Sequence, residues 1–189
     1  MGDRDVYWMR RALALAERGA GTVSPNPLVG AVVVKDGKRI AEGFHARFGG
    51  AHAESAALAK AGSRAQGATL YVTLEPCTHW GKTPPCTEAV LAAGVRRVVI
   101  ASLDPNPEGA GRGVRRLREA NLAVEAGFLR EEAERQNAPY RTWRLEGRPF
   151  VTLKWAETSD GLIAGPGGRR LSITGPAALR EAHLLRARC

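Results

Sequence analysis

Four residues of this sequence combine the side chains that a catalytic zinc site needs. His52 and Glu54 stand two positions apart, and Cys77 and Cys86 follow later, each directly after a proline. One imidazole and two thiolates supply three protein ligands, which leaves the fourth position of a tetrahedral zinc open to water. A carboxylate beside such a site can move protons, because zinc brings the pKa of its water close to neutral. The sequence therefore predicts a hydrolytic zinc site with Glu54 as the acid and base, and with His52, Cys77 and Cys86 as ligands.

The elements expected around these residues would bring them together. His52 opens an alanine-rich helix over residues 52–60, and Cys86 lies in the first turn of a second helix that begins at Pro84 and ends near Ala93. A helix N-terminus stabilises a thiolate through its unpaired N–H groups and its dipole. Cys77 follows a strand expected over residues 69–74. Because α/β folds place their sites at the carboxyl ends of strands, we expect the three ligands to converge there.

The rest of the first 146 residues alternates between strands and helices. Asp36–Gly37 forms the turn of a hairpin. The other elements expected are helices over 3–18, 113–120 and 129–137, and strands over 29–34, 39–44, 96–101 and 122–126. This alternation predicts an α/β domain in which helices pack on a largely parallel sheet that starts with an antiparallel hairpin.

The pattern restarts near residue 147. A strand is expected over 150–155, a turn over 159–161 and a helix over 176–188. One strand and one helix cannot bury an apolar face, and a βαβ unit needs a second strand. We therefore interpret residues 1–146 as one domain and residues 147–189 as the N-terminal fragment of another.

Composition and charge limit the classes of protein. The hydrophobic content of 44% is enough for a core, and no apolar run is long enough for a transmembrane helix. The polar start and the three cysteines argue against a signal peptide and a disulfide framework, so we expect a cytoplasmic protein without a membrane partner. The net charge of +9 favours an anionic partner, either nucleic acid or a phosphorylated small molecule, but the arginines form no polybasic block.

The order of the motif resembles that of the zinc deaminases that act on nucleobases, with one departure. Those enzymes usually separate the cysteines by two residues, whereas eight residues lie between Cys77 and Cys86. With this spacer, residues 24–30 (SPNPLVG), 75–86 (EPCTHWGKTPPC) and 104–107 (DPNP) closely resemble the bacterial bifunctional riboflavin-biosynthesis deaminase/reductase family. The resemblance implies a three-layer α-β-α cytidine-deaminase-like domain, followed by the start of a dihydrofolate-reductase-like α/β domain.

The same resemblance implies a reaction and a set of site residues. The reaction is the Zn²⁺-dependent hydrolytic deamination of 2,5-diamino-6-ribosylamino-4(3H)-pyrimidinone 5′-phosphate, in a homo-oligomer that binds no nucleic acid. The zinc ligands and the proton shuttle are the four residues named above. The residues implied as substrate contacts are Asn26, His45, His79, Lys82, Thr83, Asp104 and Asn106.

The second half of this family reduces the ribose with NADPH. By resemblance, Ala156 would lie near NADPH and Arg186 near the substrate phosphate. Arg170 and Ser172 stand where the family usually carries a small polar residue and an aromatic one, ahead of Ile173-Thr174-Gly175. The later nicotinamide-binding glycines are not in this sequence, so we expect no NADPH-dependent turnover from these residues alone.

Two other functions stay open at this point. A deaminase that edits tRNA adenosine would suit the positive charge, although the eight-residue spacer and the reductase-like segment argue against it. A zinc-stabilised binding subunit without catalysis would use the helix over 176–188 to dock on a partner. Ammonia release, and the substrate from which it comes, separates the three functions.

Overall fold

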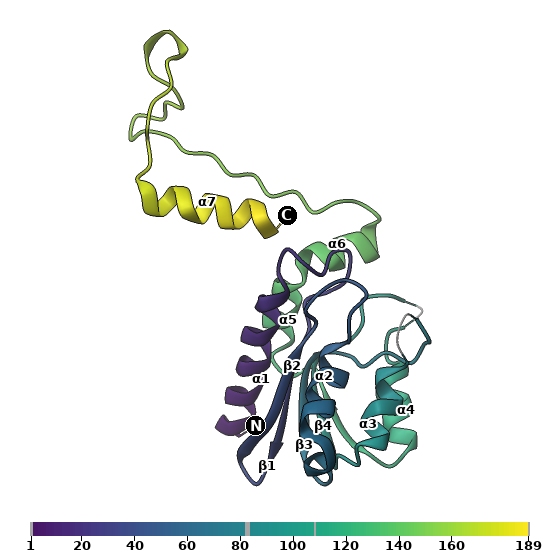
Figure 1. Ribbon diagram of the computed structural model, residues 1–189. Helices are drawn as coiled ribbons and strands as arrows, with labels where there is room; N and C mark the ends of the chain where they lie inside the picture. Colours follow the sequence, from purple (N-terminus) through teal and green to yellow (C-terminus); the bar gives the residue numbers. More distant parts are fainter. Residues whose placement is uncertain (1, 82–83, 108, 189) are drawn as a thin grey trace. The chain divides into compact units, whose positions relative to one another are not determined.

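The structure is a computed structural model that describes residues 2–81, 84–107 and 109–188 (Figure 1). It contains two compact units, residues 1–150 and residues 151–189, which we describe one at a time. Among the described residues, no helix combines the length and the apolar character needed to cross a membrane.

A five-stranded sheet forms the centre of the first unit, with the strand order β2-β1-β3-β4-β5. The strands are β1 (Gly30–Lys35), β2 (Lys38–Phe44), β3 (Thr69–Leu74), β4 (Arg97–Ser102) and β5 (Ala123–Ala126). The β1–β2 hairpin is confirmed, and its turn residues Asp36 and Gly37 both have positive φ, as a tight hairpin turn requires.

The sheet is mixed, which corrects the expectation that it is largely parallel. β1 pairs antiparallel with both β2 and β3, whereas β3–β4 and β4–β5 are parallel. The strand β3 therefore runs parallel to β2 with β1 between them. The reason is the connection through α2, which carries the chain across β1 instead of turning back beside β2.

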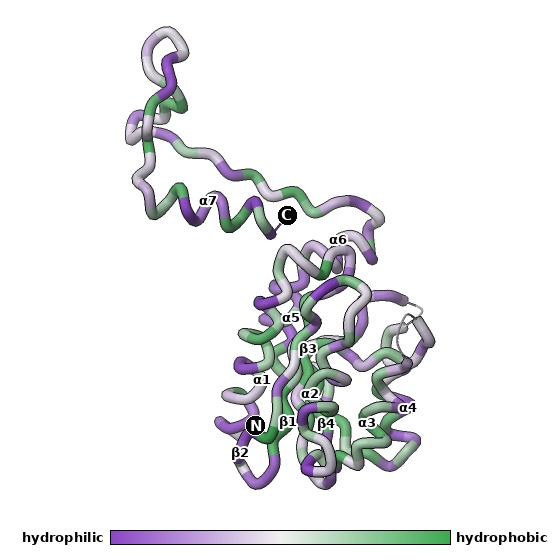
Figure 2. The backbone as a smooth tube through the Cα atoms, in the orientation of Figure 1, coloured by the Kyte–Doolittle hydropathy of each residue, from purple (hydrophilic) through white to green (hydrophobic). Residues whose placement is uncertain are grey.

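Helices cover both faces of the sheet and make three layers. On one face lie α2 (Ala53–Ala61), α3 (Cys86–Ala92) and α4 (Arg112–Glu119), and on the other α1 (Asp3–Ala16) and α5 (Arg130–Gln136). Successive residues of β1 point to opposite faces, so Val33 packs toward α2 while Val32 packs toward α1. Figure 2 shows hydrophobic positions along the central strands β1, β3 and β4. The predicted three-layer α-β-α fold is confirmed.

One helix of this unit was not expected. α6 (Ala138–Glu146) follows α5 directly, and Asn137 between them has φ −99° and ψ 21°, which breaks the helix. Two short 3-10 helices, η1 (Glu17–Gly19) and η2 (Gly62–Ala65), end α1 and α2.

The second unit contains η3 (Pro166–Gly168) and α7 (Pro176–Arg188), and α7 agrees with the predicted helix. The predicted strand over 150–155 is wrong, because the described residues of this segment pair with no other strand. A strand forms only where neighbouring backbone supplies its hydrogen bonds, and the alternating pattern here meets no such partner. Its apolar side chains Val151, Leu153 and Trp155 are exposed. A dihydrofolate-reductase-like start therefore remains a prediction.

Candidate active site

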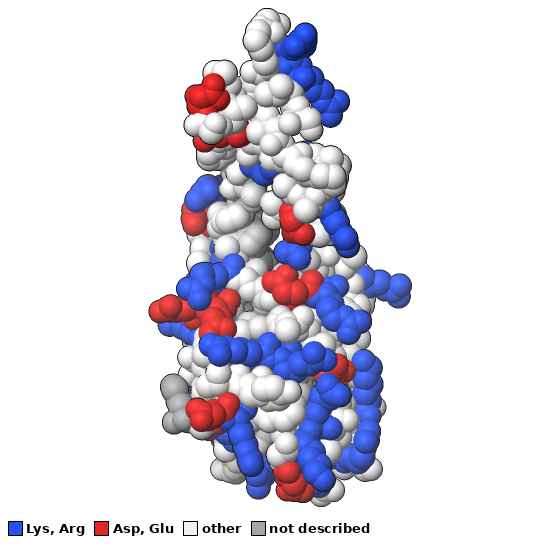
Figure 3. Space-filling model, turned by 90° about the vertical axis from the view of Figure 1, so that its left-hand side faces the viewer, with Lys and Arg blue, Asp and Glu red and all other residues white. Residues whose placement is uncertain are grey.

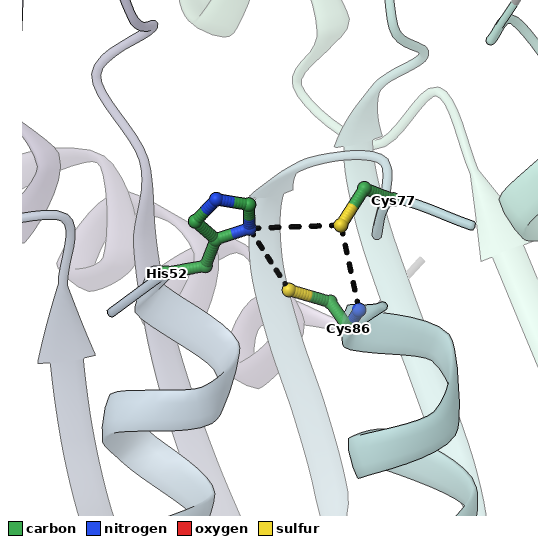
Figure 4. Close-up of side chains that lie close together, drawn as sticks. All are labelled: His52, Cys77 and Cys86. Carbon is green, nitrogen blue, oxygen red and sulfur yellow. Dashed lines mark hydrogen bonds between the residues drawn. The ribbon is translucent and has the colours of Figure 1, made fainter. Parts of the chain in front are cut away.

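Three side chains that could hold a metal ion converge at one edge of the sheet (Figure 4). His52 is the N-cap of α2, Cys86 is the first residue of α3, and Cys77 follows the end of β3. Nδ1 of His52 lies 3.1 Å from Sγ of Cys86 and 3.6 Å from Sγ of Cys77. The ligand atoms of all three lie within 4.8 Å of one another. The structure thus brings together the three residues that the sequence singled out.

The separations of these atoms fit a tetrahedral zinc ion. With Zn–N at about 2.0–2.1 Å and Zn–S near 2.3 Å, a nitrogen and a sulfur ligand lie about 3.5–3.6 Å apart. The His52–Cys77 separation agrees with this range, and the His52–Cys86 separation is about 0.5 Å shorter than it. One imidazole and two thiolates are also a donor set that zinc favours. His52, Cys77 and Cys86 would hold the ion and leave one position for water.

Hydrogen bonds at this edge stabilise a thiolate. Those from the Cys86 side chain, the His52 ring and the Cys86 backbone N–H lower the pKa of Cys77. The backbone N–H lies 3.4 Å from the Cys77 sulfur and is one of the N–H groups at the α3 N-terminus that have no acceptor within the helix. Because the thiolate is the form that binds metal, Cys77 is prepared as a ligand before any ion arrives.

Glu54 lies in the first turn of α2, where only 3% of its surface is exposed. Burial raises the pKa of Glu54 to about 7. It lines a cavity of about 160 Å³ together with His52 and Cys77. A carboxyl group with a pKa near neutrality, next to the metal ligands, suits proton transfer in both directions.

His45, directly after β2, already binds protein atoms with both ring nitrogens. Its Nδ1 donates to the carbonyl oxygen of Ala51 at 3.0 Å, and its Nε2 lies 3.1 Å from the amide nitrogen of Asn26. Because a carbonyl only accepts, the proton is on Nδ1, and Nε2 accepts from Asn26. Burial lowers the pKa of His45 and favours this neutral ring. Both His45 and Asn26 line the cavity, and the hydrogen bond between them orients the Asn26 side chain.

The loop that carries Asn26 is held by hydrogen bonds to Asn137, a residue far along the sequence. The backbone N–H of Leu28 donates to Oδ1 of Asn137 at 2.8 Å, and Nδ2 of Asn137 donates to the carbonyl of Leu28 at 2.9 Å. Asn137 is buried at the junction of α5 and α6. The break between these helices thus positions a loop that lies more than 100 residues earlier in the sequence.

The other expected substrate contacts are distributed unevenly. His79 and Asp104 line the 160 Å³ cavity, and His79 also lines a neighbouring one of about 200 Å³. Asn106 donates its backbone N–H to Oδ1 of Asp104 at 2.9 Å but is not among the described residues that line these cavities. Lys82 and Thr83 lie outside the described residues.

Sequence reasoning missed two polar residues of this cavity. Tyr140 reaches the lining from α6, a helix that the sequence did not predict. Burial raises the pKa of Tyr140 to about 12, and the nearby Asp104 contributes, so the phenol is a neutral donor. Glu75 also lines the cavity; its place directly before Pro76 and Cys77 was its only signal.

The residues expected for a reductase lie in the second unit. Ala156 is in the extended segment, Arg170 and Ser172 follow η3, and Arg186 is in α7. A guanidinium nitrogen of Arg186 lies 3.2 Å from Nδ1 of His183. The roles of these four residues remain predictions.

Comparison with known proteins agrees with this geometry. Residues 3–102 match the family described as cytidine and deoxycytidylate deaminase zinc-binding region. The chain belongs to this deaminase family. The matched range includes α2, β3 and α3 in full, together with His52, Cys77 and Cys86, so the candidate metal site lies inside it.

Relatives place this deaminase domain near the bifunctional riboflavin-biosynthesis proteins, which confirms the resemblance seen in the sequence. The chain is 50% identical over 182 residues to the riboflavin biosynthesis protein RibD of Aquifex aeolicus, covering 96% of this chain and 51% of that protein. A solved structure of Acinetobacter baumannii RibD matches with a TM-score of 0.91 and 48% identity, over 97% of this chain and 52% of that one.

A structure from Thermotoga maritima, described as a diaminohydroxyphosphoribosylaminopyrimidine deaminase/5-amino-6-(5-phosphoribosylamino)uracil reductase, matches with a TM-score of 0.90 and 46% identity. That match covers 96% of this chain and 52% of the other. The chain therefore spans about half the length of these relatives.

Proposed function

We propose that this protein hydrolytically deaminates 2,5-diamino-6-ribosylamino-4(3H)-pyrimidinone 5′-phosphate to 5-amino-6-ribosylaminouracil 5′-phosphate in riboflavin biosynthesis. The observation that carries the proposal is the convergence of His52, Cys77 and Cys86 beside the buried Glu54, around one cavity. The deaminase family of the chain and its near 50% identity to RibD proteins support it.

The residues of the cavity can divide the chemistry among themselves. Zinc, when bound to the three ligands, would supply a Lewis acid that makes water nucleophilic near neutral pH. Glu54 takes one proton from the attacking water and delivers it to the neighbouring ring nitrogen, and then carries the second water proton to the leaving amine. The bond between the ring carbon and its amino group is thereby replaced by C=O, and ammonia leaves. Asn26 can accept and donate hydrogen bonds along the edge of the heterocycle, and Asp104 can accept from its amines.

A phosphorylated small molecule suits this site better than a nucleic acid. On the face drawn in Figure 3, Asp and Glu side chains lie among the more numerous Lys and Arg side chains. Several arginines of the first unit are paired with carboxylates, such as Arg11 with Glu42 at 2.8 Å. We propose Lys82 and Thr83, next to His79 in the chain, as the phosphate and ribose contacts.

Three further assignments belong to the same proposal. Residues 147–189 would be the first part of the NADPH-dependent reductase half, because the match to RibD proteins extends over 96% of the chain. The cytoplasm would be its compartment, since metal-binding thiolates need a reducing environment. We also propose a homo-oligomer, which the exposed apolar side chains of residues 150–155 would favour.

The decisive experiment measures ammonia release from the pyrimidine phosphate by the zinc-loaded protein, with and without a chelator. The matched variant is Glu54→Gln, which should retain the metal and lose about 10²-fold to 10⁴-fold in rate because the proton shuttle is gone. A wild type that holds zinc but releases no ammonia would favour a binding role. Ammonia from a tRNA stem-loop, and none from the pyrimidine, would favour RNA editing.

A further inference from the structure

Glu75, a buried carboxylate near the metal site, has no role in the chemistry described so far, yet it accepts several hydrogen bonds. Glu75 lies directly after β3 and is 5% exposed. Its oxygens accept three backbone N–H groups, from Asp104 at 3.2 Å, Gly111 at 2.9 Å and Val114 at 3.0 Å. Asp104 and Gly111 stand at the beginning and the end of the loop that joins β4 to α4, and Val114 lies in the first turn of α4. Glu75 therefore ties both ends of this loop to the end of β3.

The energetics of this arrangement favour a defined geometry. A buried carboxylate is costly unless hydrogen bonds satisfy it, and bonds to a charged acceptor are stronger than those to a neutral one. Two of the donors, Gly111 and Val114, belong to the N-terminus of α4, where the helix dipole also favours a negative charge. The packing is equally tight, because a Cβ on Gly113 would come within 2.2 Å of the carbonyl oxygen of Pro76.

The backbone of Glu75 belongs to the segment after β3 that also carries the candidate metal ligand Cys77. The backbone N–H of Glu75 donates to the carbonyl of Ser102 at 2.9 Å, which ties it to the end of β4. Two residues later, the carbonyl of Cys77 accepts from both the N–H and the hydroxyl of Thr87 in α3, each at 3.2 Å. One residue thus joins the segment that presents Cys77 to the segment that presents Asp104.

We propose that Glu75 is a positioning residue that fixes Asp104, a wall of the substrate cavity, relative to the metal ligand Cys77. The proposal rests on the function proposed above, in which Asp104 contacts the substrate. Glu75 anchors the backbone of Asp104, and the N–H of Asn106 anchors one of its carboxylate oxygens. The carboxylate of Asp104 is then held in one orientation at the cavity wall before substrate binds.

The test is a double-variant cycle with Glu75→Gln and Asp104→Asn. Glutamine keeps the size of Glu75 but places an amide NH₂ against a backbone donor, so it should loosen the loop. We expect zinc content to be unchanged and the KM for the pyrimidine phosphate to rise about tenfold, with a much smaller change in kcat. In the Asp104→Asn background, Glu75→Gln should raise KM less than twofold further, because its effect acts through Asp104.

A matched control and a gentler variant keep the test decisive. Glu88→Gln makes the same chemical change at an exposed carboxylate that pairs with Arg116 across α3 and α4, and it should leave KM unchanged. If Glu75→Gln does not fold, Glu75→Asp keeps the charge but shortens the side chain, and it should still raise KM. The proposal is overturned if the fold-changes in KM of Glu75→Gln and Asp104→Asn multiply in the double variant. It is also overturned if a Glu75 variant loses stability without a change in KM.

Substrate affinity distinguishes failure of this proposal from failure of the proposed function. Calorimetric titration of the pyrimidine phosphate into the zinc-loaded proteins repeats the cycle without turnover. A wild type that binds the pyrimidine but releases no ammonia refutes the deaminase function, while the affinities still decide the role of Glu75. A wild type that neither binds nor deaminates it overturns both.

Discussion

Replacing Asn137 with alanine should destabilise the first unit and weaken its substrate site at the same time. Asn137 is 4% exposed, and its side chain makes two hydrogen bonds to the backbone of Leu28, at 2.8 and 2.9 Å. Each bond contributes about 1 kcal/mol net, and the unpaired N–H and C=O left at Leu28 add part of a desolvation cost. We therefore expect a loss of about 2–3 kcal/mol in the free energy of unfolding. Because Leu28 is two residues from Asn26, the affinity for the pyrimidine should fall too.

The isosteric variant Asn137→Asp provides a sharper test. Aspartate retains an acceptor for the N–H of Leu28 but turns a second oxygen toward the carbonyl of Leu28 in place of a donor. When ionised, it should be less stable than the alanine variant. When protonated, it can donate again, so folding raises its pKa above the unfolded value of about 3.9. A raised acid pKa stabilises the fold below the unfolded pKa and loses that contribution as pH rises through the folded value.

Urea unfolding followed by circular dichroism, with zinc in excess, measures both effects. The aspartate variant should gain stability relative to the alanine variant between pH 7 and pH 4. An alanine variant within about 0.5 kcal/mol of the wild type would show that the two hydrogen bonds do not hold the loop. An aspartate variant as stable as wild type at pH 7 would refute the donor and acceptor assignment.

Three other perturbations test separate parts of the structure. Hydrogen bonds from Arg97 lower the pKa of Asp5. The pair therefore stabilises the fold above the unfolded pKa of Asp5 and loses that effect as pH falls through the folded pKa. In urea unfolding, the stability of Arg97→Ala should approach that of the wild type below about pH 4. Gly43→Ala would place a Cβ 2.6 Å from the backbone of α2; thermal unfolding and zinc titration should show a loss of about 1–3 kcal/mol and weaker metal binding. His45→Gln can place its acceptor where Nε2 of His45 meets Asn26, whereas the shorter His45→Asn side chain does not reach that position, so ammonia-release kinetics should give the glutamine variant the lower KM.

Local patterns predicted most elements of the first unit, because their signals lie within the elements themselves. The apolar run at residues 29–34, the Asp36–Gly37 turn and the glycine after α2 each act over a few residues. The direction of β3 relative to β1 depends instead on where α2 crosses the sheet, which no short pattern encodes. The strand expected over 150–155 had the right alternation but lacks a pairing partner, and pairing is a property of two segments.

The residues of the candidate site likewise fall into two groups: those that local sequence signals predict and those whose place depends on distant segments. His52, Cys77 and Cys86 could be found because metal chemistry limits ligands to few residue types and α/β folds place them at predictable element ends. Tyr140 could not, because its helix depends on the break at Asn137. Glu75 stood inside a recognised motif, yet its role depends on three backbone groups from a distant loop, which the sequence does not show to be near.

The structure also explains how a metal site tolerates the eight-residue spacer between its cysteines. Cys77 is fixed by the end of β3 and by hydrogen bonds from Thr87 to its carbonyl, and Cys86 is fixed by starting α3. Each ligand thus has anchors outside residues 78–85, and a bond from the Cys86 N–H to the Cys77 sulfur spans the gap directly. The spacer can then serve recognition without disturbing the ligands, and its described part already places His79 at both cavities. Changes at His79 should accordingly alter substrate affinity while leaving zinc affinity intact.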